Sequence, residues 1–387
     1  MKASTFLQGI VDIGIQTIAG VPDSTLKQFC DAVQLDKGKR VRHYVTANEG
    51  AAVGLATGEY LIAKRPCLVY LQNSGLGNII NPLASIANQE VYGIPILFVI
   101  GWRGEPGKKD EPQHIYQGKV TCQLLEVMDV PYSIIDDMTT EIQMKEILLK
   151  ARMLMSENRQ YAIIIRKGTF EKENEFIWEN GYTLIRERAL KTILENVYSD
   201  SYIVSTTGKI SRELYEQSDV LYGNHERIFM AVGGMGHASM IAYGMAQVDL
   251  SRKIVCIDGD GAVLMHMGAV AFIAKQSPKN LLHIVINNAA HESVGSMPTG
   301  FRGQMYTQIA KSCGYKNIYI AKTEKEIAEM IIEAKNKNEL SMVEIMVSLE
   351  SRADLGRPKE NARENRIDFM NAVLKADNYN EPRFEID

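Results

Sequence analysis

Apolar residues fall into short uninterrupted runs and into longer segments with helical spacing, and the two kinds alternate along the chain. The uninterrupted runs predict strands that are buried on both faces, and in the first half they cover residues 67–71, 95–100, 132–135 and 162–165. The periodic segments predict helices over residues 3–19, 49–63, 78–90 and 140–155. Buried strands joined by helices indicate a mostly parallel sheet, because parallel neighbours require crossover connections.

The second half repeats this rhythm after a polar stretch. Its predicted strands cover residues 202–205, 254–257, 281–286 and 342–347, and its predicted helices cover 236–248, 265–276 and 324–335. Residues 168–188 are rich in Glu and Asn and have no long apolar period, which is typical of a linker. We therefore expect an α/β protein of two similar domains without a middle domain: residues 1–170, a linker over 171–188, and residues 189–387.

Composition narrows the classes of function. The 387 residues include 43 Lys plus Arg and 47 Asp plus Glu, for a net charge of −4, so the basic stripe of a nucleic-acid binder is not expected. No run reaches the roughly 18 apolar residues of a membrane span. Asp12 and Gln16 interrupt the apolar region that a signal peptide would need. We expect a cytoplasmic protein that binds a small-molecule substrate, and neither nucleic acid nor membrane.

The five cysteines do not predict a disulfide framework or a zinc cluster. They are far apart, odd in number and without a CxxC pair. Cys67 and Cys256 lie inside apolar runs, which is typical of cysteines that pack as small buried hydrophobic residues.

The most specific pattern is Gly259-Asp260-Gly261, followed 25 residues later by Asn287-Asn288. Each group comes directly after a predicted strand, and ligand sites of open parallel sheets lie at such carboxyl ends. Carboxylate, amide and carbonyl oxygens form a hard ligand set that suits Mg²⁺ with a diphosphate. A Gly-Asp-Gly alone would indicate a plain turn. Together with the paired Asn, it favours a site for Mg²⁺ and a diphosphate.

Three further segments have site-like features. Glu49 opens a predicted helix after the strand-like segment 43–45, where a carboxylate also favours the helix dipole without any catalytic role. Met235 lies in the Gly-rich segment 233–236 before another helix, where backbone N–H groups can reach a phosphate, although a Met can also simply fill a core gap. Thr206 and Thr207 follow a strand and offer hydroxyl groups.

Together these segments resemble thiamine diphosphate enzymes. The resemblance implies two thiamine diphosphate-binding domains, a pyrimidine-binding one before a diphosphate-binding one, with thiamine diphosphate and Mg²⁺ as cofactors. It implies that Glu49 acts on the aminopyrimidine to generate the cofactor ylide. It implies Mg²⁺ ligands at Asp260, Asn288 and the carbonyl of Ala290. The implied cofactor-binding residues are Asn73, Ser74, Thr206, Thr207, Gly234, Met235 (as the wedge that bends the cofactor), Gly236, Gly259 and Gly261.

The short two-domain form is similar to the phosphonopyruvate and sulfopyruvate decarboxylases. Segments 20–24, 72–78, 206–209, 235–239, 288–295 and 351–358 resemble the former group. That resemblance implies decarboxylation of 3-phosphonopyruvate to phosphonoacetaldehyde and CO₂, in biosynthesis of phosphonates such as 2-aminoethylphosphonate. Two segments depart from the expected motif: Ala289-Ala290-His291-Glu292-Ser293 replaces Gly-Ala-His-Asp-Ser, and Gly295-Ser296-Met297-Pro298-Thr299 replaces Gly-Gly-Gln-Pro-Thr.

The implied substrate carries a carboxylate and a phosphonate, with up to three negative charges, and therefore requires cations or many N–H donors. The candidates for substrate binding are Asp23, Ser24, Arg103, Lys209 and Arg352, with Lys108, Lys109 and Arg357 as further cations. Each of the cations can also be an ordinary surface charge. His114 and His291 are candidates for proton transfer, with His237 as an alternative. Residues 103–114 form a charged loop with Gly and Pro that is typical of a lid.

In such enzymes the cofactor lies between domains of two subunits, which implies a homo-oligomer with active sites at a subunit interface. The alternatives are a sulfopyruvate decarboxylase, a carboligase that joins two 2-oxoacids or an aldehyde, and a non-catalytic cofactor-binding protein. The last would be expected to lack Glu49 or a metal ligand, and both are present. A Rossmann dehydrogenase is disfavoured because no GxGxxG follows an early strand.

Overall fold

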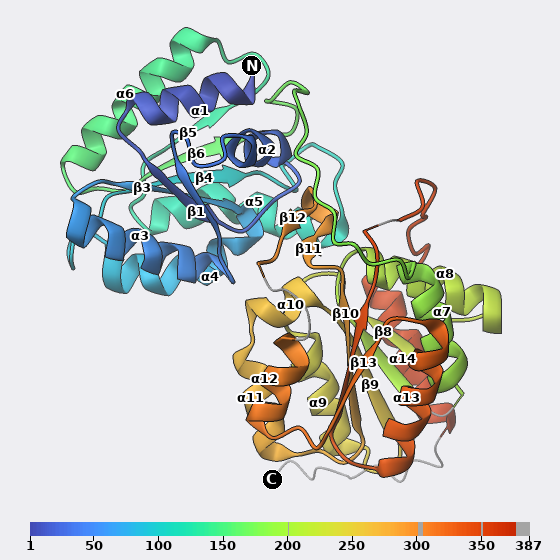
Figure 1. Ribbon diagram of the computed structural model, residues 1–387. Helices are drawn as coiled ribbons and strands as arrows, with labels where there is room; N and C mark the ends of the chain where they lie inside the picture. The colour runs from blue at the N-terminus through green and yellow to red at the C-terminus, as the bar shows by residue number, and fades with distance from the viewer. Residues whose placement is uncertain (200, 301–304, 350, 377–387) are drawn as a thin grey trace, which may run out of the picture. The chain divides into compact units, whose positions relative to one another are not determined.

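The computed structural model describes residues 1–199, 201–300, 305–349 and 351–376, and the chain divides into two compact units (Figure 1). The first unit is Met1–Glu179 together with Ala290–Gly300, and the second is Asn180–Ala289 together with Phe301–Asp387. Each unit contains a six-stranded parallel sheet flanked by helices, which confirms the expected fold class.

The sheet of the first unit has the strand order β2-β1-β3-β4-β6-β5. Its strands are β1 (Thr17–Gly20), β2 (Arg42–Val45), β3 (Cys67–Gln72), β4 (Ile96–Gly101), β5 (Tyr132–Ile135) and β6 (Tyr161–Ile165). Its helices are α1 (Ala3–Asp12), α2 (Lys27–Leu35), α3 (Glu49–Ala63), α4 (Leu76–Pro82), α5 (Pro112–Val127) and α6 (Glu141–Ser156), with the short turns η1 (Asn73–Gly75) and η2 (Leu83–Ala87).

Both faces of this sheet are buried, as the uninterrupted apolar runs predict. Leu68 and Val99 pack with α1, α2 and α6 on one face, while Val69 and Phe98 pack with α3, α4 and α5 on the other. Figure 1 shows the two helical layers on either side of the strands. The segment Ala290–Gly300, with β11 (Ala290–His291), η3 (Glu292–Val294) and β12 (Met297–Pro298), joins this unit through the buried side chain of Met297.

The sheet of the second unit has the order β13-β14-β10-β9-β7-β8. Its strands are β7 (Ser201–Ser205), β8 (Ile228–Met230), β9 (Lys253–Gly259), β10 (Leu281–Asn287), β13 (Asn317–Ala321) and β14 (Ser341–Met346). Its helices are α7 (Arg186–Val197), α8 (Lys209–Tyr222), α9 (Ala238–Val248), α10 (Asp260–Met265), α11 (Gly268–Gln276), α12 (Met305–Cys313), α13 (Glu324–Lys337) and α14 (Ala362–Ala376). In Figure 1, α7, α8 and α13 lie on one side of the sheet, and α9, α11 and α12 on the other.

The predicted helix over residues 3–19 is wrong in its second half. Helix α1 ends at Asp12, Gly14 adopts φ +95°, and residues 17–20 form the buried strand β1. The left-handed glycine breaks the helix, and the β-branched residues that follow suit a strand better than a helix. The apolar spacing therefore came from two elements of different period.

Candidate functional site

Four adjacent strands of the first sheet end at residues that the sequence singles out. Glu49 follows β2, Asp23 and Ser24 follow β1, Asn73 and Ser74 follow β3, and Arg103 follows β4. Because β2, β1, β3 and β4 are neighbours and parallel, their carboxyl ends share one edge of the sheet. The topology thus brings these residues together at the carboxyl ends of the strands, where parallel α/β sheets bind ligands.

The second sheet repeats this arrangement on its own neighbouring strands β10, β9, β7 and β8. Asn288 follows β10, Asp260 follows β9, Thr206 and Thr207 follow β7, and the Gly-rich loop with Met235 follows β8. The residues predicted for diphosphate and metal binding in this unit therefore lie at the carboxyl ends of adjacent strands.

Glu49 is the first residue of α3 and is 4% exposed. Asn48 caps the helix by accepting a hydrogen bond from the Ala51 amide at 2.9 Å, which fixes the position of Glu49 in the first turn. The amide Nδ2 of Asn78 donates a hydrogen bond of 2.7 Å to Oε2 of Glu49. Burial raises the pKa of Glu49 above its usual value, and the bond from Asn78 opposes that effect.

Gly75 leaves the space that the Glu49 side chain occupies. A Cβ at position 75 would lie 2.3 Å from Oε1 of Glu49, so a larger residue there would displace the carboxylate. The glycine is part of η1, directly after β3. The turn 73–75 therefore shapes the surroundings of the carboxylate, and Asn78 in α4 orients it.

The side chain of Asn73 stabilises this turn through hydrogen bonds. Its Nδ2 donates to the carbonyl of Arg103 at 2.8 Å and to Oγ1 of Thr121 at 2.9 Å, while its Oδ1 accepts from the Arg103 amide at 3.0 Å. The side chain thus ties the end of β3 to the end of β4. Ser74 is exposed, and its hydroxyl donates to Gln72 at 2.8 Å.

Arg103 is held by an acidic partner that the sequence did not single out. Its guanidinium donates two bonds to Asp110, of 2.8 and 2.5 Å, and one of 2.9 Å to the Ser24 hydroxyl. The guanidinium holds the pKa of Asp110 well below its usual range, together with backbone donors from Gly104 and Glu111. Asp23 is fully buried and accepts from the Thr25 amide at 2.9 Å and from Gln72 at 2.5 Å.

The expected lid is partly helical, because α5 begins at Pro112 and includes His114. Gly104 crosses this helix at close range: it has φ +67°, and a Cβ there would lie 1.9 Å from the carbonyl oxygen of His114. Burial and the nearby Arg103 lower the pKa of His114. Its Nδ1 has no hydrogen-bond partner among the described residues. A neutral imidazole here can accept or donate a proton.

His291 lies in β11, opposite Met297 of β12. It is buried, and burial lowers its pKa to about 4, so the ring is neutral at physiological pH. Its Nε2 has no hydrogen-bond partner within the described part of the chain. Ala290, whose carbonyl the motif predicts as a metal ligand, is the buried first residue of the same strand.

The two metal-ligand candidates of the second unit come from neighbouring strands. Gly259, the residue before Asp260, pairs with Ile286, which stands two residues before Asn288. Asp260 and Asn288 are both buried, with 4% and 6% exposure. A carboxylate and an amide oxygen at adjacent strand ends agree with the hard ligand set that the sequence predicts.

Asn287 supports the turn that carries Asn288. Its Nδ2 donates to Glu344 at 2.7 Å, and its Oδ1 accepts from the Ala289 amide at 2.9 Å. The Asn288 carbonyl accepts from Asn180 at 2.8 Å. Ala289 adopts φ +56°, the conformation that favours glycine, at the position where the family motif has Gly.

Thr206 and Thr207 connect the end of β7 to its neighbours. Thr206 is buried, and its amide donates to Ile257 of β9 at 2.8 Å. The Thr207 hydroxyl donates to the Val232 carbonyl at 2.9 Å, which joins the loops after β7 and β8. In the latter loop, Gly234 and Gly236 adopt positive φ angles on either side of Met235. A Cβ at position 236 would meet the ring of His266 at 2.6 Å, so this loop requires glycine there.

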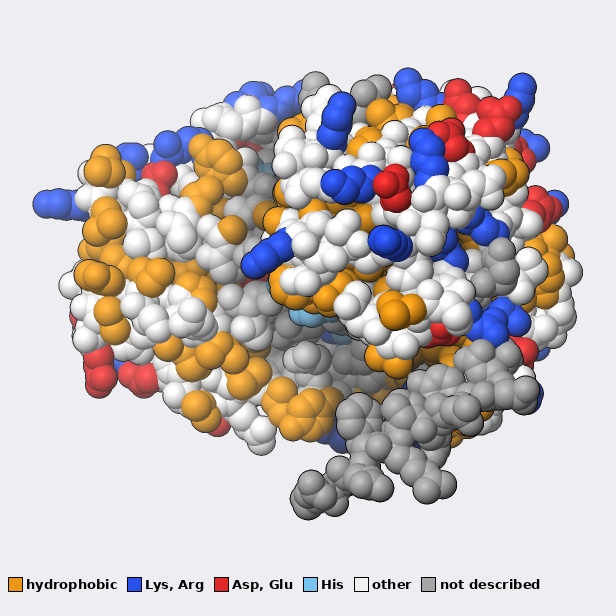
Figure 2. Space-filling view, turned by 90° about the horizontal axis from the view of Figure 1, so that it is seen from below, with side chains coloured by type: hydrophobic (Ala, Val, Ile, Leu, Met, Phe, Trp, Pro, Cys, Tyr) orange, Lys and Arg blue, Asp and Glu red, His pale blue; other side chains and the backbone are white. Residues whose placement is uncertain are grey.

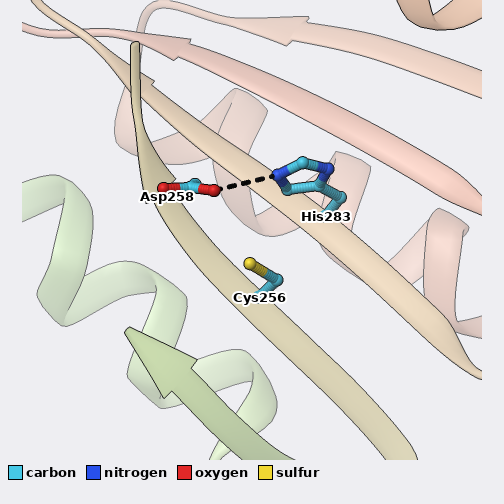
Figure 3. A group of neighbouring side chains, drawn as sticks. All are labelled: Cys256, Asp258 and His283. Carbon is cyan, nitrogen blue, oxygen red and sulfur yellow. Dashed lines mark ion pairs between the residues drawn. The ribbon is translucent and has the colours of Figure 1, made fainter. Parts of the chain in front are cut away.

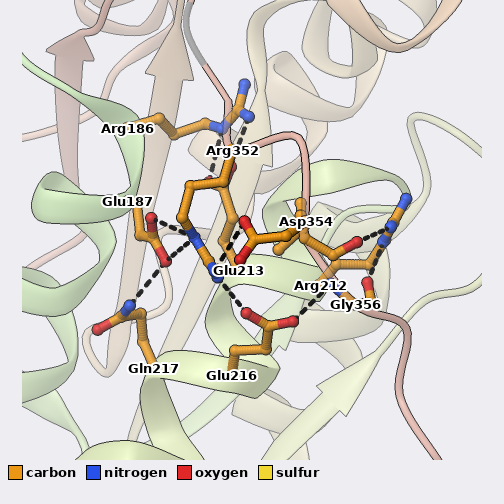
Figure 4. Close-up of polar contacts among 10 residues, drawn as sticks. Arg186, Glu187, Arg212, Glu213, Glu216, Gln217, Arg352, Asp354 and Gly356 are labelled. Atoms are coloured by element: carbon orange, nitrogen blue, oxygen red, sulfur yellow. Dashed lines mark hydrogen bonds and ion pairs between the residues drawn. The ribbon is translucent and has the colours of Figure 1, made fainter.

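Arg352 lies in a cluster of acidic side chains, all in the second unit (Figure 4). It forms ion pairs with Glu187 at 2.9 Å, with Glu216, and with Asp354 at 3.3 Å. Three carboxylates compensate the charge of Arg352, whereas Arg103 pairs with Asp110, so Arg352 is the weaker candidate for binding an anion. Lys209 donates to the Ser351 hydroxyl at 2.6 Å. The roles of both residues stay predictions.

Sequence reasoning missed two residues of the site, Asn78 and Asp110. Asn78 stands within the segment that resembles the family, but its contact with Glu49 depends on how α4 packs beside α3. Asp110 stood among other loop charges, and no spacing indicates that it pairs with Arg103.

Among the described residues, no helix has the length and apolar character needed to cross a membrane.

Two family models match the chain. The N-terminal TPP binding domain of thiamine pyrophosphate enzymes matches residues 2–124, and the C-terminal TPP binding domain of these enzymes matches residues 220–345. The two matches fall in the two halves that the sequence analysis separates.

Whole-length relatives refine this similarity. The chain is 32% identical to a phosphonopyruvate decarboxylase of Streptomyces viridochromogenes, over 92% of this chain and 91% of the relative. It is 31% identical to a phosphonopyruvate decarboxylase of Streptomyces hygroscopicus, over 93% and 90%. It is 25% identical to a sulfopyruvate decarboxylase of Methanosarcina acetivorans, over 86% and 88%.

Proposed function

Since this chain belongs to the phosphonopyruvate decarboxylase family of thiamine pyrophosphate enzymes and is a decarboxylase, we propose that it converts 3-phosphonopyruvate to phosphonoacetaldehyde and CO₂. The observation that carries the proposal is the 32% identity to a phosphonopyruvate decarboxylase over 92% of the chain. The corresponding identity to a sulfopyruvate decarboxylase is 25%. In this proposal the reaction is a step of phosphonate biosynthesis, and it takes place in the cytoplasm.

The residues present fit thiamine diphosphate, whose bound form supplies the carbon nucleophile for a 2-oxo group and the electron sink for loss of CO₂. One support is the buried Glu49 carboxylate beside Gly75, where a larger residue would collide with it. The other is the second sheet, where hydroxyl and glycine positions follow β7 and β8. The remaining residues proposed to bind the cofactor are Asn73 and Ser74 in the turn η1 after β3, Gly259 at the end of β9, and Gly261 in the first turn of α10.

Glu49 is the proton-transferring residue of this proposal. A carboxyl group whose pKa is raised by burial retains a proton closer to neutral pH, as acid catalysis requires. Asn78 holds the carboxylate in one orientation through its 2.7 Å bond. His114 and His291, both with lowered pKa values, are the candidates for moving protons to or from the substrate.

Asp260, Asn288 and the Ala290 carbonyl are proposed to hold Mg²⁺. Three oxygen ligands leave positions for phosphate oxygens and water, which is how Mg²⁺ is commonly bound with diphosphates. The support from the structure concerns Asp260 and Asn288, which follow adjacent paired strands.

The substrate carries a carboxylate and a phosphonate, and Arg103, Lys209 and Arg352 are the proposed cations. Arg103 is the best supported, because it lies beside Ser24 at the strand-end edge of the first sheet. Its pairing with Asp110 fixes the guanidinium in one orientation, which lowers the entropic cost of binding an anion. Asp23 positions this edge through its bonds to Thr25 and Gln72.

A homo-oligomer with active sites at a subunit interface is also proposed. Its support is an exposed apolar surface on the first unit around α3 and α4. Figure 2, seen from the side on which these helices lie in Figure 1, shows hydrophobic side chains gathered there. The surface includes Leu61, Ile62, Ile80, Val91 and Tyr92, with Ile62 89% exposed. Large exposed apolar patches mark association sites, and light scattering of the purified protein tests the assembly.

The function is tested by incubating the enzyme with phosphonopyruvate, with and without thiamine diphosphate and Mg²⁺, and measuring both CO₂ and aldehyde. Stoichiometric release of both products that requires the two cofactors is expected. CO₂ release without free aldehyde, together with a new C–C bond in the product, would instead establish a carboligase. Absence of turnover in protein that binds the cofactor would refute the proposed substrate.

A further inference from the structure

A group of three buried side chains in the second unit lies outside the site described above. Cys256 and Asp258 stand two residues apart on β9, and His283 stands on the neighbouring strand β10, directly opposite Cys256. Residues two apart on a strand share one face of the sheet, so all three side chains point the same way (Figure 3). The exposed fraction is 0% for Cys256 and Asp258 and 1% for His283.

The potential ligand atoms of the three side chains converge. Sγ of Cys256, a carboxylate oxygen of Asp258 and a ring nitrogen of His283 all lie within 4.8 Å of one another. Oδ2 of Asp258 and Nε2 of His283 are 3.7 Å apart, which is too long for a hydrogen bond. Neither atom has a hydrogen-bond partner in the described part of the chain. Two buried polar atoms without partners are costly unless another group satisfies them.

The second ring nitrogen of His283 is occupied. Its Nδ1 lies 3.3 Å from the hydroxyl of Tyr315, a residue that follows α12. In the tautomer with the proton on Nδ1, the imidazole donates to this hydroxyl and the lone pair of Nε2 faces Asp258 and Cys256. A hydrogen bond at one ring nitrogen commonly orients a histidine whose other nitrogen binds a metal.

We propose that Cys256, Asp258 and His283 form a buried zinc site that joins β9 to β10. Thiolate, carboxylate and imidazole are the ligand types that zinc takes in proteins, and a thiolate with an imidazole selects zinc over Mg²⁺. One thiolate and one carboxylate neutralise the two positive charges of the ion, so the loaded site adds no net charge to the interior. A water completes the tetrahedral coordination.

A bound zinc ion would hold β9 and β10 together close to the residues proposed to bind Mg²⁺ and the diphosphate. β9 ends at Gly259, directly before Asp260, and β10 ends at Asn287, directly before Asn288, so the metal would fix the two strands that lead to the proposed Mg²⁺ ligands. Zinc binding at these three residues does not depend on which substrate the enzyme takes. The spacing of residues in the sequence does not indicate this zinc site, because the third ligand, His283, comes from the next strand.

The test is elemental analysis of the full-length protein, purified without chelator and in the presence of zinc. About one zinc per chain is expected in the wild type. Zinc is expected to fall to background in Cys256→Ala and to remain in the control Cys67→Ala, which removes another buried strand cysteine. A folded wild type without stoichiometric zinc, or full zinc content in Cys256→Ala, would overturn the site.

X-ray absorption of the wild-type protein keeps the test decisive if Cys256→Ala does not fold. One sulfur scatterer at about 2.3 Å together with nitrogen or oxygen scatterers is expected. A zinc shell that contains only nitrogen and oxygen would contradict the involvement of Cys256.

Discussion

The side chain of Asn78 donates a 2.7 Å hydrogen bond to the carboxylate of Glu49, across the packed helices α3 and α4. Glu49 is buried, and burial disfavours its charged form, whereas the bond from Asn78 favours that form. The pair therefore sets both the orientation and the proton affinity of the residue proposed for catalysis.

Replacing Asn78 with Ala should slow turnover without preventing folding. A hydrogen bond to a charged group contributes about 1.5–3 kcal/mol, so a loss of roughly 10–100-fold in kcat is expected. The pH dependence of kcat should also shift to higher pH. The hydrogen bond from Asn78 lowers the pKa of Glu49, so its loss leaves the raising effect of burial unopposed. Asn81→Ala is the matched control, since Asn81 lies in the same helix and contacts Ser85 rather than Glu49. Equal effects of the two changes would remove Asn78 from the account.

Glu49→Gln should bind thiamine diphosphate and lose at least roughly 100-fold in kcat, the range of general acid–base catalysis. The amide keeps the size of the side chain but cannot transfer the proton. Cofactor affinity is measured by fluorescence titration and turnover by CO₂ release. Retained turnover would eliminate Glu49 as the proton-transferring residue.

The same substitution should stabilise the cofactor-free protein at neutral pH. The pKa of Glu49 is raised in the folded state, so the folded state binds more protons than the unfolded state, and stability falls as pH rises from about 4.5 upward. Glutamine does not titrate. The stability advantage of Glu49→Gln in urea unfolding should thus be absent below pH 4.5 and grow above it. An advantage that is constant with pH would contradict the burial effect.

Asp260→Ala should weaken Mg²⁺-dependent cofactor binding by at least the roughly 10–100-fold that loss of even an outer metal partner costs. The carboxylate is the strongest ligand of the proposed set, and its removal leaves neutral oxygens. The measurement is cofactor affinity as a function of Mg²⁺ concentration. Asp354→Ala, an exposed acidic residue of the same unit, should leave that affinity unchanged. An unaltered Mg²⁺ dependence in Asp260→Ala would refute the metal assignment.

Ala289→Gly should stabilise the protein by about 1 kcal/mol. Ala289 adopts φ +56°, where an L side chain is strained and glycine is not. Ala290→Gly is the control: this residue lies in β11 and is not among those with positive φ, so the change should destabilise. Thermal unfolding of both variants measures the difference, and destabilisation by Ala289→Gly would disprove the strain.

The buried strands and the strand-end motifs could be predicted from sequence, because each depends on residues close together in the chain. The run 67–71 has no polar alternation, and it became β3 with both faces packed. The strand β1 was hidden because Ile18 continued the apolar spacing of α1 by coincidence. The left-handed φ of Gly14 marks the break between the two elements.

Contacts between elements could not be predicted, because they depend on packing and register. The pairing of His283 with Cys256 requires the register of two strands that a helical segment separates in the sequence, and the bond from Asn78 to Glu49 requires the packing of two helices. The polar end of the tail from residue 363 to 387 is predicted from the sequence to be partly loose, and because residues 377–387 lie outside the described part of the chain, this stays a prediction. The residues before them, Ala362–Ala376, form helix α14.

The central claim is the identity of the substrate, and the most direct measurement is kcat/KM for phosphonopyruvate and for sulfopyruvate, side by side, with saturating thiamine diphosphate and Mg²⁺. The two substrates differ only in their terminal anion, so the ratio reports how the enzyme recognises that group. A kcat/KM at least roughly tenfold higher for phosphonopyruvate is predicted, which corresponds to about 1.4 kcal/mol of preferential transition-state binding. A ratio in favour of sulfopyruvate would contradict the proposed substrate and leave the decarboxylase chemistry in place.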